Sequence, residues 1–186
     1  MGITGFTRID TVTVPDRFMA VVTVSDSEGM DPEEIKAVLE SDKTSLDYLG
    51  VRSDSDPLMF PDLYKNIKSV RPKGMKVMLI SQGSDPDALD DLVGAGYVHA
   101  MDILVDRGIT EEQRRCMSIL EDNGCRYAIS IKAADHDDET VRRMASDCKG
   151  CSMFIIRLEK DRPVKKGDLS ALTGAAKAVT WNVRAS

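Results

Sequence analysis

The stretch KVMLISQGSDPDALDDLVGAGYVHAMDI (76–103) decides which class of fold the sequence predicts. Its first part, 76–81, is a continuous apolar run of the kind found in strands that are buried on both faces. The following segment, 84–93, has a polar cap residue and then Pro86, which is typical of the first turn of a helix. A second apolar run, 97–105, predicts the next strand. A strand, a helix and a strand in this order indicate a βαβ unit with parallel strands.

The same alternation extends along the chain in both directions. Further strands are expected at 18–24, 46–52, 125–131 and 152–159, and helices at 31–41, 61–70, 111–124 and 137–147. Six such units with continuous apolar strands predict an α/β fold in which parallel strands alternate with helices. Periodicity alone allows both an open doubly wound sheet and a barrel or partial barrel.

Length and composition limit the classes of function. A chain of 186 residues is expected to form a single domain, 1–186, with one substantial core. A net charge of −6 argues against nucleic-acid partners and anionic membrane surfaces, which both favour a basic patch. No apolar run approaches the roughly 20 residues that span a bilayer, and the first ten residues do not resemble a secretory signal. We therefore expect a soluble, cytoplasmic protein.

Polar side chains gather where the predicted strands end. In parallel α/β folds these carboxyl ends lie at one edge of the sheet, where ligands bind. Asp102 lies within an apolar strand, so its carboxylate needs a partner, which Lys132 or Arg157 would supply. An alternative is that Asp54, Asp56 and Asp102 together bind a hard divalent cation. The candidate ligand-binding residues are Asp54, Ser55, Asp56, Ser81, Gln82, Asp102, Lys132 and Arg157.

The cysteines all lie late in the chain. Cys148 and Cys151 form a C-x-x-C pair, but this pair precedes a strand, whereas a thioredoxin-like motif opens a helix. Cys125 also begins a strand, so Cys125, Cys148 and Cys151 are weak candidates for a structural zinc site. Cys116 lies in the middle of a predicted helix and is a poor fourth ligand. Small buried thiols are the favoured interpretation of all four residues.

Taken in order, three segments resemble the radical SAM superfamily. They are GFTRIDTVTVPDRFMAVVTV (5–24), SLDYLGVRSDSDPLMFPDL (45–63) and the stretch 76–103 quoted above. The group that they resemble most is the activating proteins of glycyl-radical enzymes, namely anaerobic ribonucleotide reductase activase and pyruvate formate-lyase activase. The resemblance implies a partial (β/α)6 TIM-like barrel with an N-terminal extension at 1–16. The segment 163–186 would add a C-terminal helix and strand.

The departures from that family fall on its chemistry. In the family the first barrel strand leads into C-x-x-x-C-x-x-C, whose three thiolates hold a 4Fe–4S cluster. Here that strand leads into SDSEG (25–29). The family's Gly-Gly-Glu-Pro segment, which meets the amino group of S-adenosylmethionine, reads Asp54-Ser55-Asp56-Pro57, and its Thr-Asn-Gly reads Ser81-Gln82-Gly83. We therefore expect neither the cluster nor S-adenosylmethionine, nor any other cofactor.

These observations predict a non-catalytic relative of the activases that serves as a binding, scaffolding or regulatory subunit. Its expected partner is a protein: an activase, a glycyl-radical enzyme or another complex. The alternative is an enzyme with repurposed chemistry that binds a small ligand or a divalent metal through Asp54, Asp56 and Asp102.

Overall fold

The computed structural model describes residues 2–10, 18–27, 29–42, 44–148, 150–180 and 182–186. The strands are β1 (Gly2–Asp10), β2 (Phe18–Ser25), β3 (Tyr48–Ser53), β4 (Lys76–Ser81), β5 (Ala100–Val105), β6 (Arg126–Lys132), β7 (Met153–Arg157) and β8 (Val183–Ala185). The helices are α1 (Pro32–Asp42), α2 (Leu63–Val70), α3 (Pro86–Gly94), α4 (Glu111–Asp122), α5 (Asp138–Asp147) and α6 (Lys166–Lys177). Two short 3₁₀ turns, η1 (Pro57–Met59) and η2 (Ala133–Asp135), follow β3 and β6.

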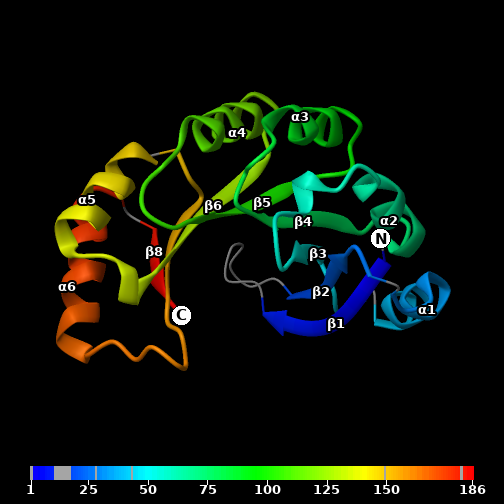
Figure 1. The fold of residues 1–186 in the computed structure, drawn as a ribbon, viewed down its shortest axis with the longest axis horizontal. Helices are drawn as coiled ribbons and strands as arrows, with labels where there is room; N and C mark the ends of the chain where they lie inside the picture. The colour runs from blue at the N-terminus through cyan, green and yellow to red at the C-terminus, as the bar shows by residue number, and fades with distance from the viewer. Residues whose placement is uncertain (1, 11–17, 28, 43, 149, 181) are drawn as a thin grey trace.

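The strands form one sheet in sequential order, from β1 at one edge to β8 at the other. All neighbours from β2 to β8 pair in parallel, whereas β1 pairs with β2 antiparallel. The sheet curves into an arc with the helices on its convex side, and β1 and β8 do not pair with each other (Figure 1). A doubly wound sheet would have helices on both faces. The structure is therefore the partial barrel that the family resemblance implied, with an open sheet.

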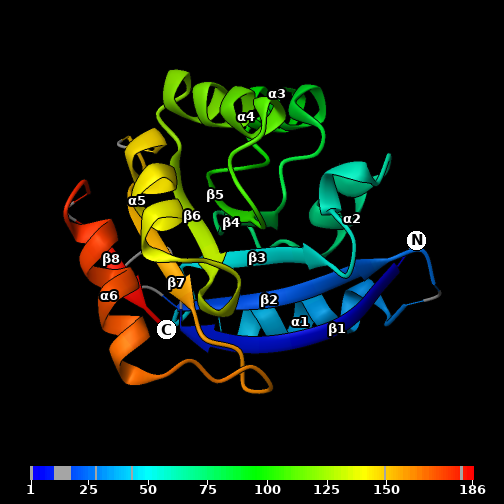
Figure 2. The ribbon, with the colours of Figure 1, turned by 60° about the vertical axis from the view of Figure 1, so that its left-hand side comes forward.

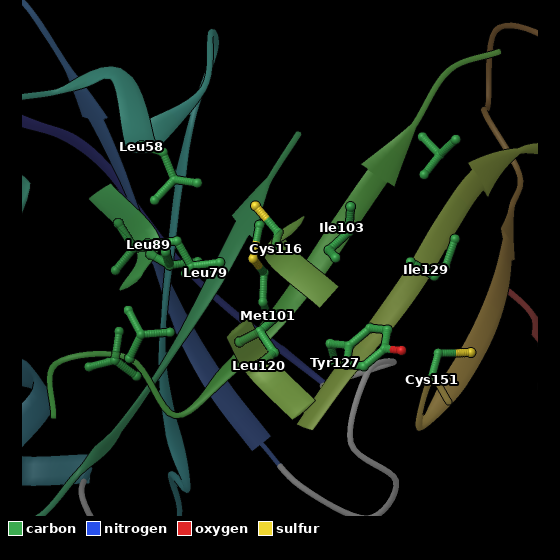
Figure 3. Packing of buried hydrophobic residues seen from close by; sticks show 14 of the residues in the cluster. Leu58, Leu79, Leu89, Met101, Ile103, Cys116, Leu120, Tyr127, Ile129 and Cys151 are labelled. Atoms are coloured by element: carbon green, nitrogen blue, oxygen red, sulfur yellow. The ribbon is translucent and has the colours of Figure 1, made fainter. Parts of the chain in front are cut away.

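The two faces of the sheet carry different layers. The convex face holds the main apolar core, in which side chains from β4, β5 and β6 pack under α3 and α4 (Figure 3). Fully buried side chains such as Leu79, Met101 and Ile129 each contribute about 1.5–3 kcal/mol to stability. The concave face has two small apolar clusters, one of Met19, Val21, Tyr48, Met78 and Ala100 and one of Ala128, Met153 and Ile155. Side chains alternate between the layers along each strand, as strand geometry requires.

Local sequence accounts for the starts of the helices. Asp85 caps α3, because its carboxylate accepts a hydrogen bond from the Ala88 N–H at 3.0 Å. Asp137 caps α5 through the Thr140 N–H at 2.8 Å. Both helices begin where the sequence predicted them, within one or two residues.

The expected strand at 97–105 is wrong at its beginning, because β5 starts only at Ala100. Gly96 has φ +72°, and the Tyr97 and Val98 N–H groups both donate to the Leu92 carbonyl. These bonds close the end of α3 in a Schellman-like turn, which keeps the chain from becoming extended. His99 therefore precedes the strand and does not lie within it.

The N-terminal segment was expected only as an extension, at 1–16, and the structure gives part of it a definite role. Gly2–Asp10 is the edge strand β1, which lies beside β2 in both views (Figures 1 and 2). Residues 1 and 11–16 of the expected extension, Glu28 of the SDSEG segment and residue 181 of the expected C-terminal segment fall outside the described residues. Within the described ranges, no helix combines the length and apolar character needed to cross a membrane.

Candidate functional site at the carboxyl ends of the strands

By the sequence resemblance, the loop after β2 corresponds to the segment in which the resembled family holds its cluster. The Ser25 and Ser27 hydroxyls lie 2.5 Å apart, and the Ser27 N–H donates to Ser25 Oγ at 3.2 Å. The Met30 N–H then donates to the Ile3 carbonyl of β1 at 2.7 Å. A Cβ atom on Gly29 would collide with the backbone of Ile3, so only glycine fits there. The end of this loop, at Gly29 and Met30, is thus fixed to the neighbouring strand β1.

The sequence resemblance aligns Asp56 with the glutamate of the family's Gly-Gly-Glu-Pro segment, and in this structure the Asp56 carboxylate is hydrogen-bonded to its own chain. It accepts hydrogen bonds from Ser81 Oγ at 2.5 Å, from the Ser84 N–H at 2.9 Å and from the Leu58 N–H at 3.1 Å. The residue is only 4% exposed. Through these three bonds Asp56 joins the loop after β3 to the end of β4 and to the approach to α3. Its role in this structure is to hold three segments together.

The end of β4 is closed by a second set of contacts. Gly83 has φ +73°, and its N–H donates to Ser81 Oγ at 2.9 Å. The Gln113 side-chain amide donates to the carbonyls of Gln82 and Leu104, at 2.9 and 3.1 Å. Gln113 also completes a capping box at the start of α4. Sequence reasoning missed this residue, although the Thr-x-x-Gln pattern at 110–113 was a usable signal for it.

A hollow of about 590 Å³ opens beside these contacts, at the carboxyl ends of β4 and β5. Gln82 lies on its wall, together with Asp106 and Arg107. The Gln82 side chain is exposed, so of the residues predicted at the end of β4 it is the one accessible to a ligand. Ser81 is buried and already bonded on both sides.

Asp102 lies in the concave face of the sheet, where it is 1% exposed. Its carboxylate accepts a hydrogen bond from Ser130 Oγ at 2.6 Å and forms an ion pair with Arg157. Of the two partners that the sequence suggested, Arg157 is the one bonded to Asp102. An isolated buried carboxylate is costly, and these two contacts offset that cost.

Lys132, the other suggested partner, instead joins a chain of charges at the ends of β6 and β7. Its ammonium lies 3.1 Å from Glu159, whose other oxygen is 3.7 Å from Arg162. Arg162 also lies 2.6 Å from Asp135. The hydrogen bond that Lys132 donates to Glu159 raises the pKa of Lys132, and the one that Asp135 accepts from Arg162 lowers the pKa of Asp135. Lys132, Asp135 and Arg162 are exposed and Glu159 is half-buried, so each of these pairs contributes little to stability.

The structure does not bring Asp54, Asp56 and Asp102 together. Asp54 and Ser55 are exposed in the loop after β3, Asp56 is buried below them, and Asp102 lies on the concave face of β5. In the described part of the chain, no three His, Cys, Asp or Glu side chains are placed to hold one metal ion. The geometry does not favour the divalent-metal alternative, because both buried carboxylates already have protein partners.

The cysteines fall into separate parts of the fold. Cys116, on α4, lies in the apolar layer near Leu79, whereas Cys151 lies before β7 in another part of that layer (Figure 3). All four thiols are free, and Cys116, Cys148 and Cys151 are buried. Burial raises the pKa of Cys116 to about 12 and that of Cys151 to about 11, and it also raises the pKa of Cys148. Protonated thiols in apolar surroundings are inert, as expected of packing residues.

We therefore expect slow thiol chemistry in the folded protein. At pH 8, Ellman's reagent should react first with Cys125, which is half-buried, and with the other three only on the timescale of unfolding. Burial also raises the pKa of Cys125, so its reaction should be slower than that of a small free thiol. Mass spectrometry after brief alkylation identifies the modified residue, and urea-unfolded protein supplies the control in which all four react. Rapid labelling of Cys148 and Cys151 in the folded chain would contradict the assignment.

Comparison with known proteins gives similarity at the level of the fold. No model of a known protein family and no curated protein matches the sequence. Streptococcus suis SuiB bound to S-adenosylmethionine is similar with a TM-score of 0.63 and 11% identity over 88% of this chain. Archaeal TYW1 gives 0.51 and 10% over 87%, and Mycobacterium tuberculosis tryptophan synthase gives 0.51 and 15% over 83%.

The chain spans 45% of the SuiB chain, 72% of TYW1 and 67% of the tryptophan synthase chain. The likeness to SuiB and TYW1 supports the open α/β fold with mostly parallel strands that is described above. At such low identity it is evidence for the fold and for nothing else, and the tryptophan synthase match underlines that one architecture carries different activities.

The residues present do not fit the two cofactors of the family that the sequence resembles, the 4Fe–4S cluster and S-adenosylmethionine. A 4Fe–4S cluster needs thiolates that converge on one point. Cys116 lies on α4, Cys148 follows α5, and Cys125 and Cys151 lie just before β6 and β7, whereas the loop after β2 contains no cysteine. The carboxylate that would meet S-adenosylmethionine is instead bonded to Ser81, Ser84 and Leu58. We derive no chemical step through either group.

Proposed function

We propose that this chain is a radical-SAM-like protein that works without an iron–sulfur cluster. Its role would be that of a binding, scaffolding or regulatory subunit related to the activating proteins of glycyl-radical enzymes. The partner in this proposal is another protein of such a system.

One observation carries the proposal. Asp56 stands where the resembled family presents a carboxylate to S-adenosylmethionine, yet its oxygens accept three hydrogen bonds from its own chain. A ligand amine would have to displace groups that are already bonded and largely shielded from water. Such a displacement costs about 1–3 kcal/mol for each buried donor left without a partner. The same atoms that would bind the cofactor therefore stabilise the fold.

The loop after β2 supports the proposal independently. It has no cysteine, and its backbone lies so close to β1 that a side chain at Gly29 would clash. Accommodating a cluster would require breaking the hydrogen bond from the Met30 N–H to the Ile3 carbonyl and moving an edge strand. Both cofactor positions have thus become structural positions, while the α/β framework around them is kept.

The direct test is anaerobic reconstitution. After incubation with iron, sulfide and reductant followed by desalting, the protein should stay colourless and hold no stoichiometric iron. With dithionite and S-adenosylmethionine it should produce no 5′-deoxyadenosine, and calorimetry should detect no S-adenosylmethionine binding. The physical reason is that soft thiolate ligands are absent from the loop that would have to supply them.

A radical SAM enzyme with an intact C-x-x-x-C-x-x-C motif, treated in parallel, serves as the positive control. A variant of this chain with all four cysteines replaced by serine separates specific ligation from iron that sticks to the surface. A stable iron–sulfur spectrum that this variant loses, together with cleavage of S-adenosylmethionine, would refute the proposal.

A further inference from the structure

A cavity of about 570 Å³ lies at the amino ends of the strands, at the end of the sheet opposite to the site described above. Its volume is within the range of about 300–1,000 Å³ that small-molecule sites occupy. Lys76 and Arg126 line it, being the first residues of β4 and β6, and Lys73 lines it from the turn after α2. Part of the wall is apolar, formed by Leu46 and Met75.

The placement of two of these cations follows from the sheet. Strand pairing sets Lys76 beside Tyr48 and Arg126 beside Ala100, and both neighbours belong to the apolar cluster of the concave face. Neighbours in register point to the same face, so Lys76 and Arg126 begin their strands on the side away from the helices. The negative end of a helix attracts cations and explains Lys73, which follows α2. It does not explain the other two.

Among the described lining residues of the cavity, Asp47 alone carries a negative charge, against three cations. In the ranges that the structure describes, no carboxylate forms an ion pair with Lys73, Lys76 or Arg126. Asp47 is the one carboxylate among the described lining residues, and it accepts a hydrogen bond from the Phe18 N–H at 3.2 Å. The chain as a whole carries a net charge of −6, whereas this cavity gathers three cations that form no ion pair within the described residues. The local charge of the cavity is therefore opposite in sign to that of the whole chain.

The pKa of His99 is also affected by the positive charge near the cavity. Its ring lines the cavity, and Nδ1 accepts a hydrogen bond from the Val77 N–H at 3.2 Å. The pKa of His99 is lowered, first by burial and then by the nearby charges of Arg71 and Lys76. The imidazole is therefore neutral at physiological pH, and the positive charge of the cavity comes from the lysines and arginines.

We propose that this cavity binds a small organic phosphate, with the phosphoryl group held by Lys76 and Arg126 and assisted by Lys73. An arginine fork pairs with two phosphate oxygens, and a lysine adds a compact charge. Leu46 and Met75 would cover the uncharged part of the ligand. This inference goes beyond the proposed function and does not depend on whether the cluster has been lost.

Calorimetric titration with ribose 5-phosphate and with inorganic phosphate at low ionic strength tests the proposal. Both should bind, and amide shifts in an isotope-labelled sample should move around residues 73–76 and 124–126. The organic probe should bind more tightly than inorganic phosphate does, because only it contacts the apolar wall. The double variant Lys76→Gln/Arg126→Gln should bind at least about tenfold more weakly, since it removes two charge-assisted contacts.

The matched control is Lys68→Gln/Arg143→Gln, which makes the same change in net charge at two exposed positions on α2 and α5. Its affinity should stay within about twofold of the wild type, because neither Lys68 nor Arg143 lines the cavity. Equal weakening in both double variants would show a general charge effect and overturn the proposal. So would the absence of binding to the wild type, or shifts confined to another face. If the test variant unfolds, Lys73→Gln replaces it, with weaker binding than the wild type expected.

Discussion

Replacing Asp56 by alanine should lower the free energy of unfolding by about 3 kcal/mol, because it leaves buried donors without an acceptor. The carboxylate accepts from Ser81 Oγ and from the N–H groups of Ser84 and Leu58, so the change releases three segments at once. One of these bonds, from the Leu58 N–H, is the cap of η1, and loss of a cap alone costs about 0.5–2 kcal/mol. Urea denaturation followed by circular dichroism measures the effect.

Asp54→Ala is the matched control for this experiment. Asp54 is an aspartate in the same loop, but it is exposed, so its removal should change stability by no more than about 0.5 kcal/mol. The pair of variants tests whether Asp56 has a structural role. If Asp56→Ala were as stable as the wild type, the carboxylate would not be holding the loops together and would again be a candidate ligand group.

Replacing Arg157 by methionine should destabilise the protein by about 2–3 kcal/mol at neutral pH. The change leaves the Asp102 carboxylate, 1% exposed, without its cationic partner. Breaking a buried ion pair by removing one member costs about 3–5 kcal/mol, and the expected value is lower here because water reaches part of Arg157. Lys132→Met, which breaks an exposed pair with Glu159, should cost less than about 1 kcal/mol.

A double-mutant cycle distinguishes the ion pair from simple loss of packing. Asp102→Asn combined with Arg157→Met removes both charges and keeps an acceptor for Ser130 Oγ. The double variant should therefore be more stable than Arg157→Met alone, with a coupling energy of about 1–3 kcal/mol. Additive losses in the cycle would mean that the two side chains stabilise the sheet independently.

These two carboxylates also show how much of the candidate site could be predicted. The sequence indicated that Asp102 would be buried and need a partner, because it stands in an apolar strand. It could not choose between Lys132 and Arg157, because both follow neighbouring strands. In the structure Asp102 of β5 pairs with Arg157 of β7, on the far side of β6, whereas Lys132 pairs with Glu159.

The proposed metal set did not assemble, for a reason that lies in strand geometry. Asp56 is in a loop beyond the end of β3, whereas Asp102 is the third residue of β5 and points to the concave face. The sequence shows that a residue is near the end of a strand. It does not show how far along the barrel axis that residue lies, or on which face of the sheet its side chain lies. The network of Gln113 was missed for a similar reason, since its contacts with Gln82 and Leu104 connect residues that are distant in sequence.

Local features were sufficient where the physical cause is local. The cap and proline at the start of α3 and the apolar runs of β4 and β7 depend on hydrogen bonds and burial within a few residues, so the sequence alone determined them. The absence of cysteines after the first parallel strand is likewise a fact of sequence. Only the tertiary structure decided that the sheet stays an open arc with β1 as its antiparallel edge. It also decided that Asp56 is bonded to the protein and that Lys76 and Arg126 meet at one cavity, because these outcomes depend on contacts between strands far apart in the chain.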